Sequence, residues 1–268
     1  MIFIAAFVAV FLLLWVLFYG IGPALERLLK RSAHFTAKFR YRDYLPVFVL
    51  VGAGIAASMA AGDAFLDLAE SLQEDSPELH AVDATFHEWA TTTRSPGSTM
   101  FFTTLTIIGT PVGLAALLAI VSVFLAVRKR WRWIAYLVIT CGIGGLLNLQ
   151  LKSYFARARP ELAEALRSAH GYSFPSGHAM GSTIVFAALA YLAFRILTRW
   201  RHRAAALAFA ATMFIAISIS RIYLGVHWIS DVGAGIAAGL LWVVVATVAY
   251  ETFRRIRLVR SLRAKRAP

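Results

Sequence analysis

Three short polar clusters interrupt an otherwise apolar sequence, and each contains residue types that can bind an anion or transfer a proton. The first is K-S-Y-F-A-R-A-R-P at 152–160, the second is Y-S-F-P-S-G-H at 172–178, and the third is S-R-I-Y-L-G-V-H-W-I-S-D at 220–231. Each cluster lies at one end of a long apolar stretch. If these ends meet at one membrane face, the three clusters can form a single pocket.

The cations of these clusters favour a bound anion. Lys152, Arg159 and Arg221 all lie beside apolar stretches, where a basic side chain costs about 2.5–3.5 kcal/mol at mid-membrane. One such residue alone could extend its charge to the lipid head groups. Three on one face are better explained by an anion, because Arg offers a planar fork to phosphate oxygens and Lys offers a point charge.

The segment from Pro175 to His178 is suited to the start of a helix that faces this anion. Pro175 fits a first helical turn, and the free N–H groups of that turn attract negative charge. Gly177 allows close backbone approach, and the hydroxyl of Ser176 adds a donor. This position between two cationic clusters makes an anion site the favoured interpretation.

Two histidines of these clusters could carry out the chemistry. His227 and Asp231 are four residues apart and would share one helix face. A carboxylate bonded to one ring nitrogen fixes the tautomer and leaves the other nitrogen basic, as a nucleophile requires. His178 could then act as a general acid. The alternative is a helix-capping Asp231 beside an interfacial His227.

Two other uses of these groups compete with phosphate chemistry. Two histidines and Asp231 could supply three zinc ligands, but Lys152, Arg159 and Arg221 would repel a metal ion, so we expect none. A hydrolase triad of Ser176, a histidine and Asp231 is also conceivable. Three surrounding cations suit a phosphate better than an ester or peptide carbonyl.

The composition predicts that membrane-spanning helices position these clusters. Of the 268 residues, 59% are hydrophobic and 15% are charged, whereas soluble domains carry about 25% charged residues. A helix of about 20 apolar residues crosses a bilayer, and lipid forces backbone groups to pair within the segment. The candidate spans are 1–22, 45–62, 101–127, 134–151, 178–198, 204–220 and 229–250.

The charge distribution predicts how these spans are oriented. A net charge of +13 could suit a nucleic-acid partner, but the basic residues gather in alternate loops, which is the positive-inside pattern. We therefore expect no nucleic-acid partner and a multi-pass membrane protein. The short loops and compact size lead us to expect a bacterial inner (cytoplasmic) membrane. The predicted cytoplasmic segments are 23–44, 128–133, 199–203 and the C-terminal tail, and the predicted outer segments are 63–100, 152–177 and 221–228.

The predicted fold is all-α, a polytopic membrane helical bundle. It has a six-span core at 45–250, preceded at 1–44 by one extra span with a basic cytoplasmic linker and followed at 251–268 by a basic tail. The apolar run at 1–22 precedes its basic residues, unlike a signal peptide, so we expect an uncleaved span with its N-terminus outside. A short outer helix is expected across 64–72.

Together the clusters resemble the signature of the type 2 phosphatidic acid phosphatase superfamily, K-x6-R-P, P-S-G-H and S-R-x5-H-x3-D, over about 45–250. The resemblance implies a phosphohistidine on His227, with Asp231 orienting the ring and His178 protonating the leaving oxygen. It implies that no metal or other cofactor is needed. The residues it assigns to the phosphoryl oxygens are Lys152, Arg159, Ser176, Gly177 and Arg221.

The resemblance leaves the substrate open. Undecaprenyl diphosphate, phosphatidylglycerophosphate or phosphatidic acid, and the 1-phosphate of lipid A all remain candidates, as does transfer of phosphate between lipids. A vanadate-dependent peroxidase shares such a site but fits a membrane-embedded chain poorly, and a non-catalytic lipid transporter is a remote alternative. We expect the lipid to reach the pocket sideways, near Gly142–Gly145. The sequence does not predict an oligomeric state.

Overall fold

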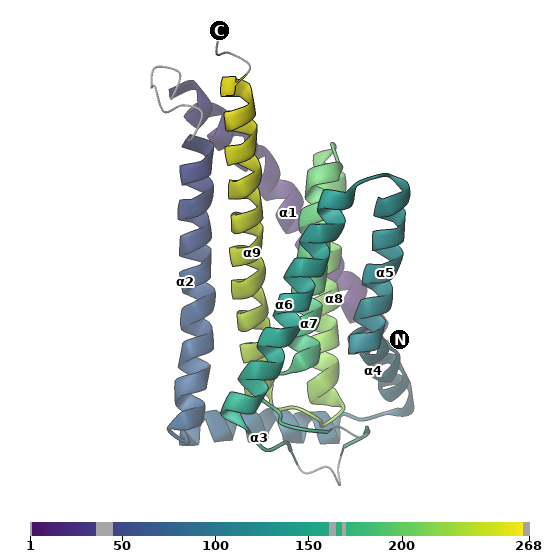
Figure 1. The fold of residues 1–268 in the computed structure, drawn as a ribbon. Coiled ribbons are helices and arrows are strands. Elements are labelled where there is room, and N and C mark those ends of the chain that lie inside the picture. Colours follow the sequence, from purple (N-terminus) through teal and green to yellow (C-terminus); the bar gives the residue numbers. More distant parts are fainter. Residues whose placement is uncertain (1, 36–44, 161–164, 168–169, 265–268) are drawn as a thin grey trace.

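A computed structural model describes residues 2–35, 45–160, 165–167 and 170–264. The described residues form helices and irregular connections, without a strand (Figure 1). The helices are α1 (Ile2–Phe35), α2 (Leu45–Gln73), α3 (Pro77–Thr92), α4 (Pro96–Ile108), α5 (Pro111–Val127), α6 (Trp131–Phe155), α7 (Gly177–Ile196), α8 (Trp200–Tyr223) and α9 (Ile229–Ala264).

Six of the described helices are long and apolar enough to cross a membrane, and α4 with α5 makes a seventh candidate if the bent pair is one span. This confirms the predicted all-α membrane bundle. The span predicted at 101–127 corresponds to α4 and α5, which are bent by 56° at the break between them. Pro111 lacks an N–H for the preceding turn, and the Thr110 side chain accepts from Gly113 N to cap a new helix.

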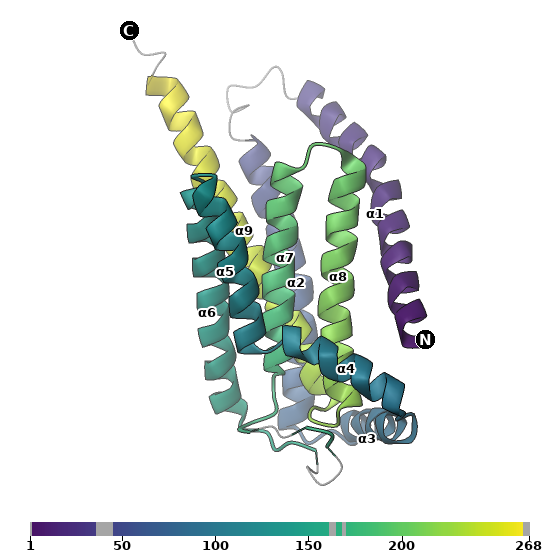
Figure 2. The same ribbon diagram turned by 90° about the vertical axis from the view of Figure 1, so that its right-hand side faces the viewer.

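The outer segment also differs from expectation. Residues 64–72 do not form a separate short helix, because α2 continues without interruption to Gln73. The separate helix is α3, which begins where the Ser76 side chain accepts from Leu79 N and Pro77 occupies the first turn. It lies across the ends of the spanning helices rather than along them (Figure 2). It therefore covers the end of the bundle where the three polar clusters lie.

The extra N-terminal helix packs along α8. The indole Nε1 of Trp200, at the start of α8, donates to the carbonyls of Phe18 and Tyr19 at 3.1 Å. At the other end, the ring of Phe3 lies 6.4 Å from that of Tyr223. The two helices are therefore antiparallel, and the beginning of α1 lies toward the end of the bundle that α3 covers.

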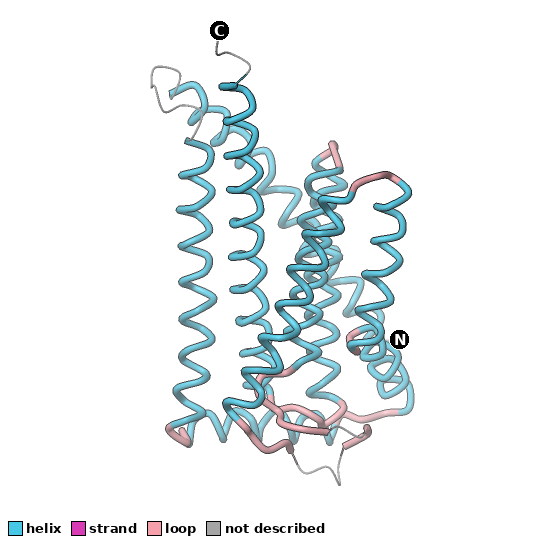
Figure 3. Tube along the Cα trace, viewed as in Figure 1, coloured by secondary structure: helices cyan, strands magenta, loops and turns pink. Residues whose placement is uncertain are grey.

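Helix α7 occupies the centre of the bundle, where α6, α8 and α9 all pack against it. Two glycines of α9 permit its close approach: a Cβ at Gly235 would lie 2.8 Å from the Ser176 carbonyl oxygen, and one at Gly239 would lie 2.9 Å from Thr183 Cβ. The irregular segments after α6 and α8 gather at the end that α3 covers (Figure 3). This packing fixes the start of α9 against the start of α7.

Candidate active site

Helix ends bring the predicted site residues to one end of the bundle. Lys152 is in the last turn of α6, Arg221 is in the last turn of α8, and Asp231 is in the first turn of α9. Ser176 precedes α7, which begins with Gly177 and His178. Arg159 and His227 lie in the connections that follow α6 and α8.

His227 is held between a carboxylate and a guanidinium. Its Nδ1 lies 3.2 Å from Asp231 Oδ2, and its Nε2 lies 3.1 Å from Nη1 of Arg159. Because a guanidinium can only donate, Nε2 must be the acceptor and Nδ1 must carry the proton that faces Asp231. The backbone N–H of Trp228 also donates to Asp231 Oδ2, at 3.0 Å. This tautomer leaves the Nε2 lone pair directed toward the cationic side of the site.

Burial reinforces the neutral state of this imidazole. His227 is 3% exposed, and desolvation lowers its pKa from 6.5 to about 4, although the hydrogen bond and charge of Asp231 act in the opposite direction. At neutral pH the ring is therefore uncharged. A histidine nucleophile needs this state, since its attacking nitrogen must not carry a proton.

The cations Lys152 and Arg159 bind carbonyls of the segments that precede α7 and α9. Lys152 Nζ donates to the carbonyl of Tyr172 at 2.7 Å. Arg159 donates from Nε to the carbonyl of Gly171 at 2.9 Å and from Nη1 to that of Val226 at 2.7 Å. Both side chains are thereby fixed near one another, and among the described residues neither forms an ion pair with a carboxylate.

Near these cations, three polar atoms are buried and have no hydrogen-bond partner among the described residues. They are the Ser176 hydroxyl and His178 Nε2 of the second cluster, and Arg221 Nε of the third cluster. Arg221 is anchored through Nη1, which donates to Thr106 Oγ1 at 2.7 Å, and His178 is close enough to Arg221 and His227 to interact electrostatically with both. Buried unpaired donors are costly, and phosphoryl oxygens are acceptors that would pair with them.

Gly177 keeps the backbone of α7 close to α6. A Cβ at this position would lie 3.0 Å from Asn148 Oδ1 and 3.6 Å from Lys152 Cε. The backbone N–H of Ser176 donates to the carbonyl of Asp231 at 2.9 Å. The first turn of α7, whose N–H groups have no partner within the helix, is thus fixed beside Lys152 and the start of α9.

Two charged residues that sequence reasoning missed hold Asp231 in place. Arg157 donates through Nη1 to Asp231 Oδ1 and through Nη2 to Asp83 Oδ2, both at 2.7 Å. Asp83 comes from α3 and also accepts from the backbone N–H of Ser230, at 3.0 Å. All these side chains are buried. Arg157 falls among the variable positions of K-x6-R-P, and Asp83 is one of many acids predicted outside, so no sequence pattern pointed to either residue.

The geometry also tests the two competing uses of the site. The Ser176 hydroxyl has no hydrogen bond to a histidine, and His227 Nε2 faces Arg159 instead, so no serine–histidine pair is formed. Among the described residues, no three His, Cys, Asp or Glu side chains lie together as metal ligands would. Independence from metal remains a prediction.

Comparison with known proteins identifies the family. The model of the PAP2 superfamily matches residues 130–255. Phosphatidylglycerophosphatase B of Bacillus subtilis is 30% identical over 195 residues, which cover 72% of this chain and 94% of that protein. The chain belongs to the PAP2 superfamily. This confirms the family inferred from the three motifs.

Two solved structures share the fold. The crystal structure of a transmembrane PAP2-type phosphatidylglycerolphosphate phosphatase from Bacillus subtilis aligns with a TM-score of 0.66 at 29% identity, covering 71% of this chain and 94% of that one. The structure of Aquifex aeolicus LpxE aligns with a TM-score of 0.50 at 23% identity, over 61% and 93% of the chains.

A further PAP2 relative matches over a shorter region. The lipid A 1-phosphatase of Rhizobium johnstonii is 35% identical over 128 residues, which cover 44% of this chain and 48% of that protein. This PAP2 protein is thus a multi-pass membrane protein whose named relatives are bacterial phosphatases of lipids.

Proposed function

We propose that this PAP2 protein hydrolyses a lipid phosphate through a phosphohistidine on His227. The observation that carries the proposal is the arrangement of His227: Asp231 lies on its Nδ1 side and Arg159 on its Nε2 side. The unpaired Ser176, His178 and Arg221 atoms lie in the adjoining turns. A neutral nucleophile beside unpaired donors and cations matches the needs of phosphoryl transfer, where positioning and charge stabilisation dominate.

The first step forms the phosphoenzyme. Nε2 of His227 attacks phosphorus, and the bond from phosphorus to the leaving oxygen breaks. The positive charge that develops on the imidazole is stabilised by the carboxylate of Asp231. His178 enters this step protonated, a state that a neighbouring phosphate anion favours, and gives its proton to the leaving oxygen. Lys152, Arg159 and Arg221 stabilise the charge on the equatorial oxygens.

The second step reverses these roles. A water molecule attacks phosphorus and gives a proton to the now neutral His178. The phosphorus–nitrogen bond breaks, so inorganic phosphate leaves and His227 regains its lone pair. Neither reaction step requires a metal ion, because side-chain cations provide the positive charge. We propose that the protein is active with a chelator present.

The substrate that we favour is phosphatidylglycerophosphate. The Bacillus subtilis relative named for that activity is matched over 94% of its length, whereas the lipid A 1-phosphatase is matched over about half. Undecaprenyl diphosphate and phosphatidic acid also present a terminal phosphate, so they remain candidate substrates to be tested. We propose that the site faces the exterior of a bacterial inner membrane, since basic loops mark the opposite face.

The test is phosphate release by the purified full chain in detergent with EDTA present. The substrates are short-chain phosphatidylglycerophosphate, phosphatidic acid, a prenyl diphosphate and lipid A 1-phosphate. We expect His227→Ala to lower turnover by more than about 1,000-fold, as loss of a covalent nucleophile does. The matched control is His202→Ala, which removes an exposed histidine and should leave turnover unchanged.

Trapping the intermediate separates this mechanism from others. Acid-labile, base-stable label from a ³²P-labelled substrate should attach to the wild type and be absent from His227→Ala. Turnover that survives in His227→Ala would refute the mechanism, and turnover that depends on added metal would refute the proposed cofactor independence. Label that passes to a second lipid faster than to water would make the protein a phosphotransferase.

A further inference from the structure

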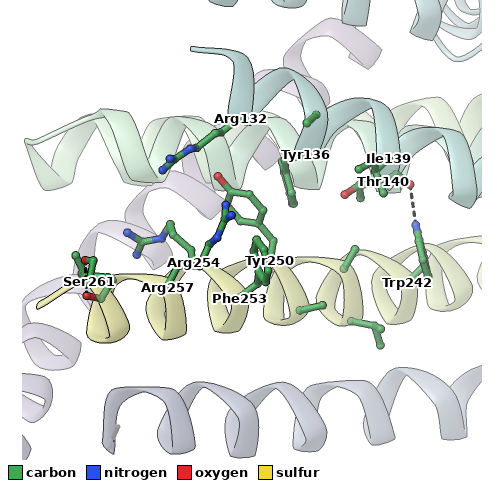
Figure 4. A pocket seen from close by; sticks show the side chains of 15 residues that line it. Arg132, Tyr136, Ile139, Thr140, Trp242, Tyr250, Phe253, Arg254, Arg257 and Ser261 are labelled. Carbon is green, nitrogen blue, oxygen red and sulfur yellow. Dashed lines mark hydrogen bonds between the residues drawn. The ribbon is translucent and has the colours of Figure 1, made fainter. Parts of the chain in front are cut away.

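A cavity lies toward the end of the bundle opposite the candidate active site. Its volume is about 930 Å³, within the range of about 300–1,000 Å³ usual for ligand pockets. Helices α6 and α9 form its two walls (Figure 4). Arg132 lies here in the first turn of α6, while Lys152 is 20 residues further along that helix, a rise of about 30 Å. The cavity is therefore separate from the site where Lys152 lies.

The lining of the cavity changes from apolar to cationic along its length. At the inner end, Trp242 Nε1 donates to the carbonyl of Thr140 at 2.7 Å and ties the two helices together. Toward the membrane surface the walls carry Tyr250 and Phe253, and then Arg254 and Arg257 (Figure 4). From Trp242 to Ser261, the α9 wall rises about 28 Å, roughly the depth of a bilayer's hydrocarbon core.

The charge at the mouth of the cavity is net positive. The Arg254 guanidinium is paired, since its Nη2 lies 2.7 Å from Glu251 Oε2. In the described part of the chain, neither Arg132 nor Arg257 forms an ion pair with a carboxylate. Both side chains are exposed, and Arg257 rests over the ring of Phe253 at 4.9 Å. Two unneutralised guanidinium groups thus lie beside an apolar trough.

We propose that this cavity binds an anionic phospholipid from the leaflet opposite the candidate active site, which the loop charges predict to be cytoplasmic. The phosphate would lie between Arg132 and Arg257, as basic pockets between spanning helices bind anionic head groups. The acyl chain would follow the apolar part of the trough toward Trp242. A free phosphate ion would leave that apolar part uncovered, so the lipid is the occupant that fits both ends.

Bound lipid would brace α6 against α9, the helices that carry Lys152 and Asp231 at the other membrane face. The proposal does not depend on the catalytic mechanism, because it concerns residues that take no part in it. Binding can therefore be measured on a catalytically inactive protein as well as on the wild type.

The test is native mass spectrometry of the full chain titrated with dioleoyl phosphatidylglycerol, with dioleoyl phosphatidylcholine as the neutral probe. We expect Arg132→Gln with Arg257→Gln to weaken phosphatidylglycerol binding about 10- to 30-fold, the loss expected when two arginines leave an anionic surface. Arg128→Gln with Arg201→Gln removes the same charge from exposed positions outside the cavity and should leave binding unchanged.

A second variant tests the apolar part without changing charge. Ala246→Trp fills the trough and should also displace the lipid, while circular dichroism reports whether the fold is kept. Equal weakening by both arginine pairs would overturn the proposal, because binding would then follow overall charge. So would equal binding of phosphatidylcholine, or loss of the lipid in Arg159→Gln but not in Arg132→Gln with Arg257→Gln, which would place it at the other face.

Discussion

Replacing Arg157 with Gln tests whether the support of Asp231 matters for turnover. Arg157 is 8% exposed and bridges two buried carboxylates, those of Asp83 and Asp231. In the variant, Asp231 Oδ1 keeps only the Ser173 hydroxyl, at 3.4 Å. The carboxylate is then less firmly held against Nδ1 of His227, so the imidazole spends less time as the tautomer that attack requires.

The size of the effect follows from the contacts that are lost. A hydrogen bond to a charged group is worth about 1.5–3 kcal/mol, and each 1.4 kcal/mol is a factor of about ten in rate. Loss of the bond to Asp231 should therefore lower kcat about 10- to 100-fold. The KM should change little, because Arg157 is occupied by carboxylates and does not face the unpaired donors. Breaking a buried ion pair also costs about 3–5 kcal/mol of stability.

The assay is steady-state phosphate release from a soluble short-chain substrate, with a thermal melt of each variant in the same detergent. Arg203→Gln is the control for general destabilisation, since Arg203 is half-buried and packs on Phe194 at the other end of the bundle. Arg157→Lys should recover part of kcat, because it keeps one charged contact. Unchanged kcat in folded Arg157→Gln, or an equal loss in Arg203→Gln, would refute the reasoning.

Three further predictions concern pH, the helix start and lipid access. The pKa of His227 lies at about 4, below its ordinary 6.5, so between pH 6.5 and 4 the unfolded chain takes up a proton that the folded chain does not. As the pH is lowered from 6.5 to 4, the free energy of unfolding should decrease, and it should decrease less in His227→Ala. The value of kcat/KM should fall only as the pH approaches 4. A fall of kcat/KM that is already centred near pH 6.5 would contradict this. Gly177→Ala places a Cβ 3.0 Å from Asn148 Oδ1 and should lower turnover several-fold without unfolding, as kinetics and melts would report; an unchanged kcat/KM would count against a crowded phosphate cradle. Leu at Gly142 and Gly145, where a Cβ meets nothing within 4 Å, should reduce activity on long-chain lipids more than on a soluble ester, and equal loss on both would argue against sideways access.

Much of the site was predictable because its residues lie close together in three short stretches of sequence. His227 and Asp231 are four residues apart and are in contact as expected, although His227 lies in the connection just before α9 and not on the helix itself. The apolar stretches and the loop charges likewise predicted where the helices would lie. The roles of the predicted residues stay predictions until the variants are measured.

The features that were not predicted from the sequence depend on contacts between distant segments or on local breaks in a helix. The pairing of Asp83 with Arg157 joins residues 74 positions apart, and no periodicity signals such a contact. The division of 101–127 into α4 and α5 follows from Thr110 and Pro111, and hydropathy averaged over a long window conceals a break of that size. Helix α2 continues through residues 64–72, beyond the apolar stretch 45–62 from which the span was predicted.

The carbonyls that hold Lys152 and Arg159 have a consequence for the end of the reaction cycle. In the proposed mechanism, three cations close to His227 would otherwise retain inorganic phosphate strongly, and the retained product would slow the next turnover. In this protein the backbone oxygens of residues 171–173 already engage two of the three cations. These carbonyl oxygens would compete with the phosphate product for the same donors and would pair with them again when phosphate leaves. A loop shifted away from these side chains would give an enzyme that binds phosphate more tightly and recovers from inhibition more slowly.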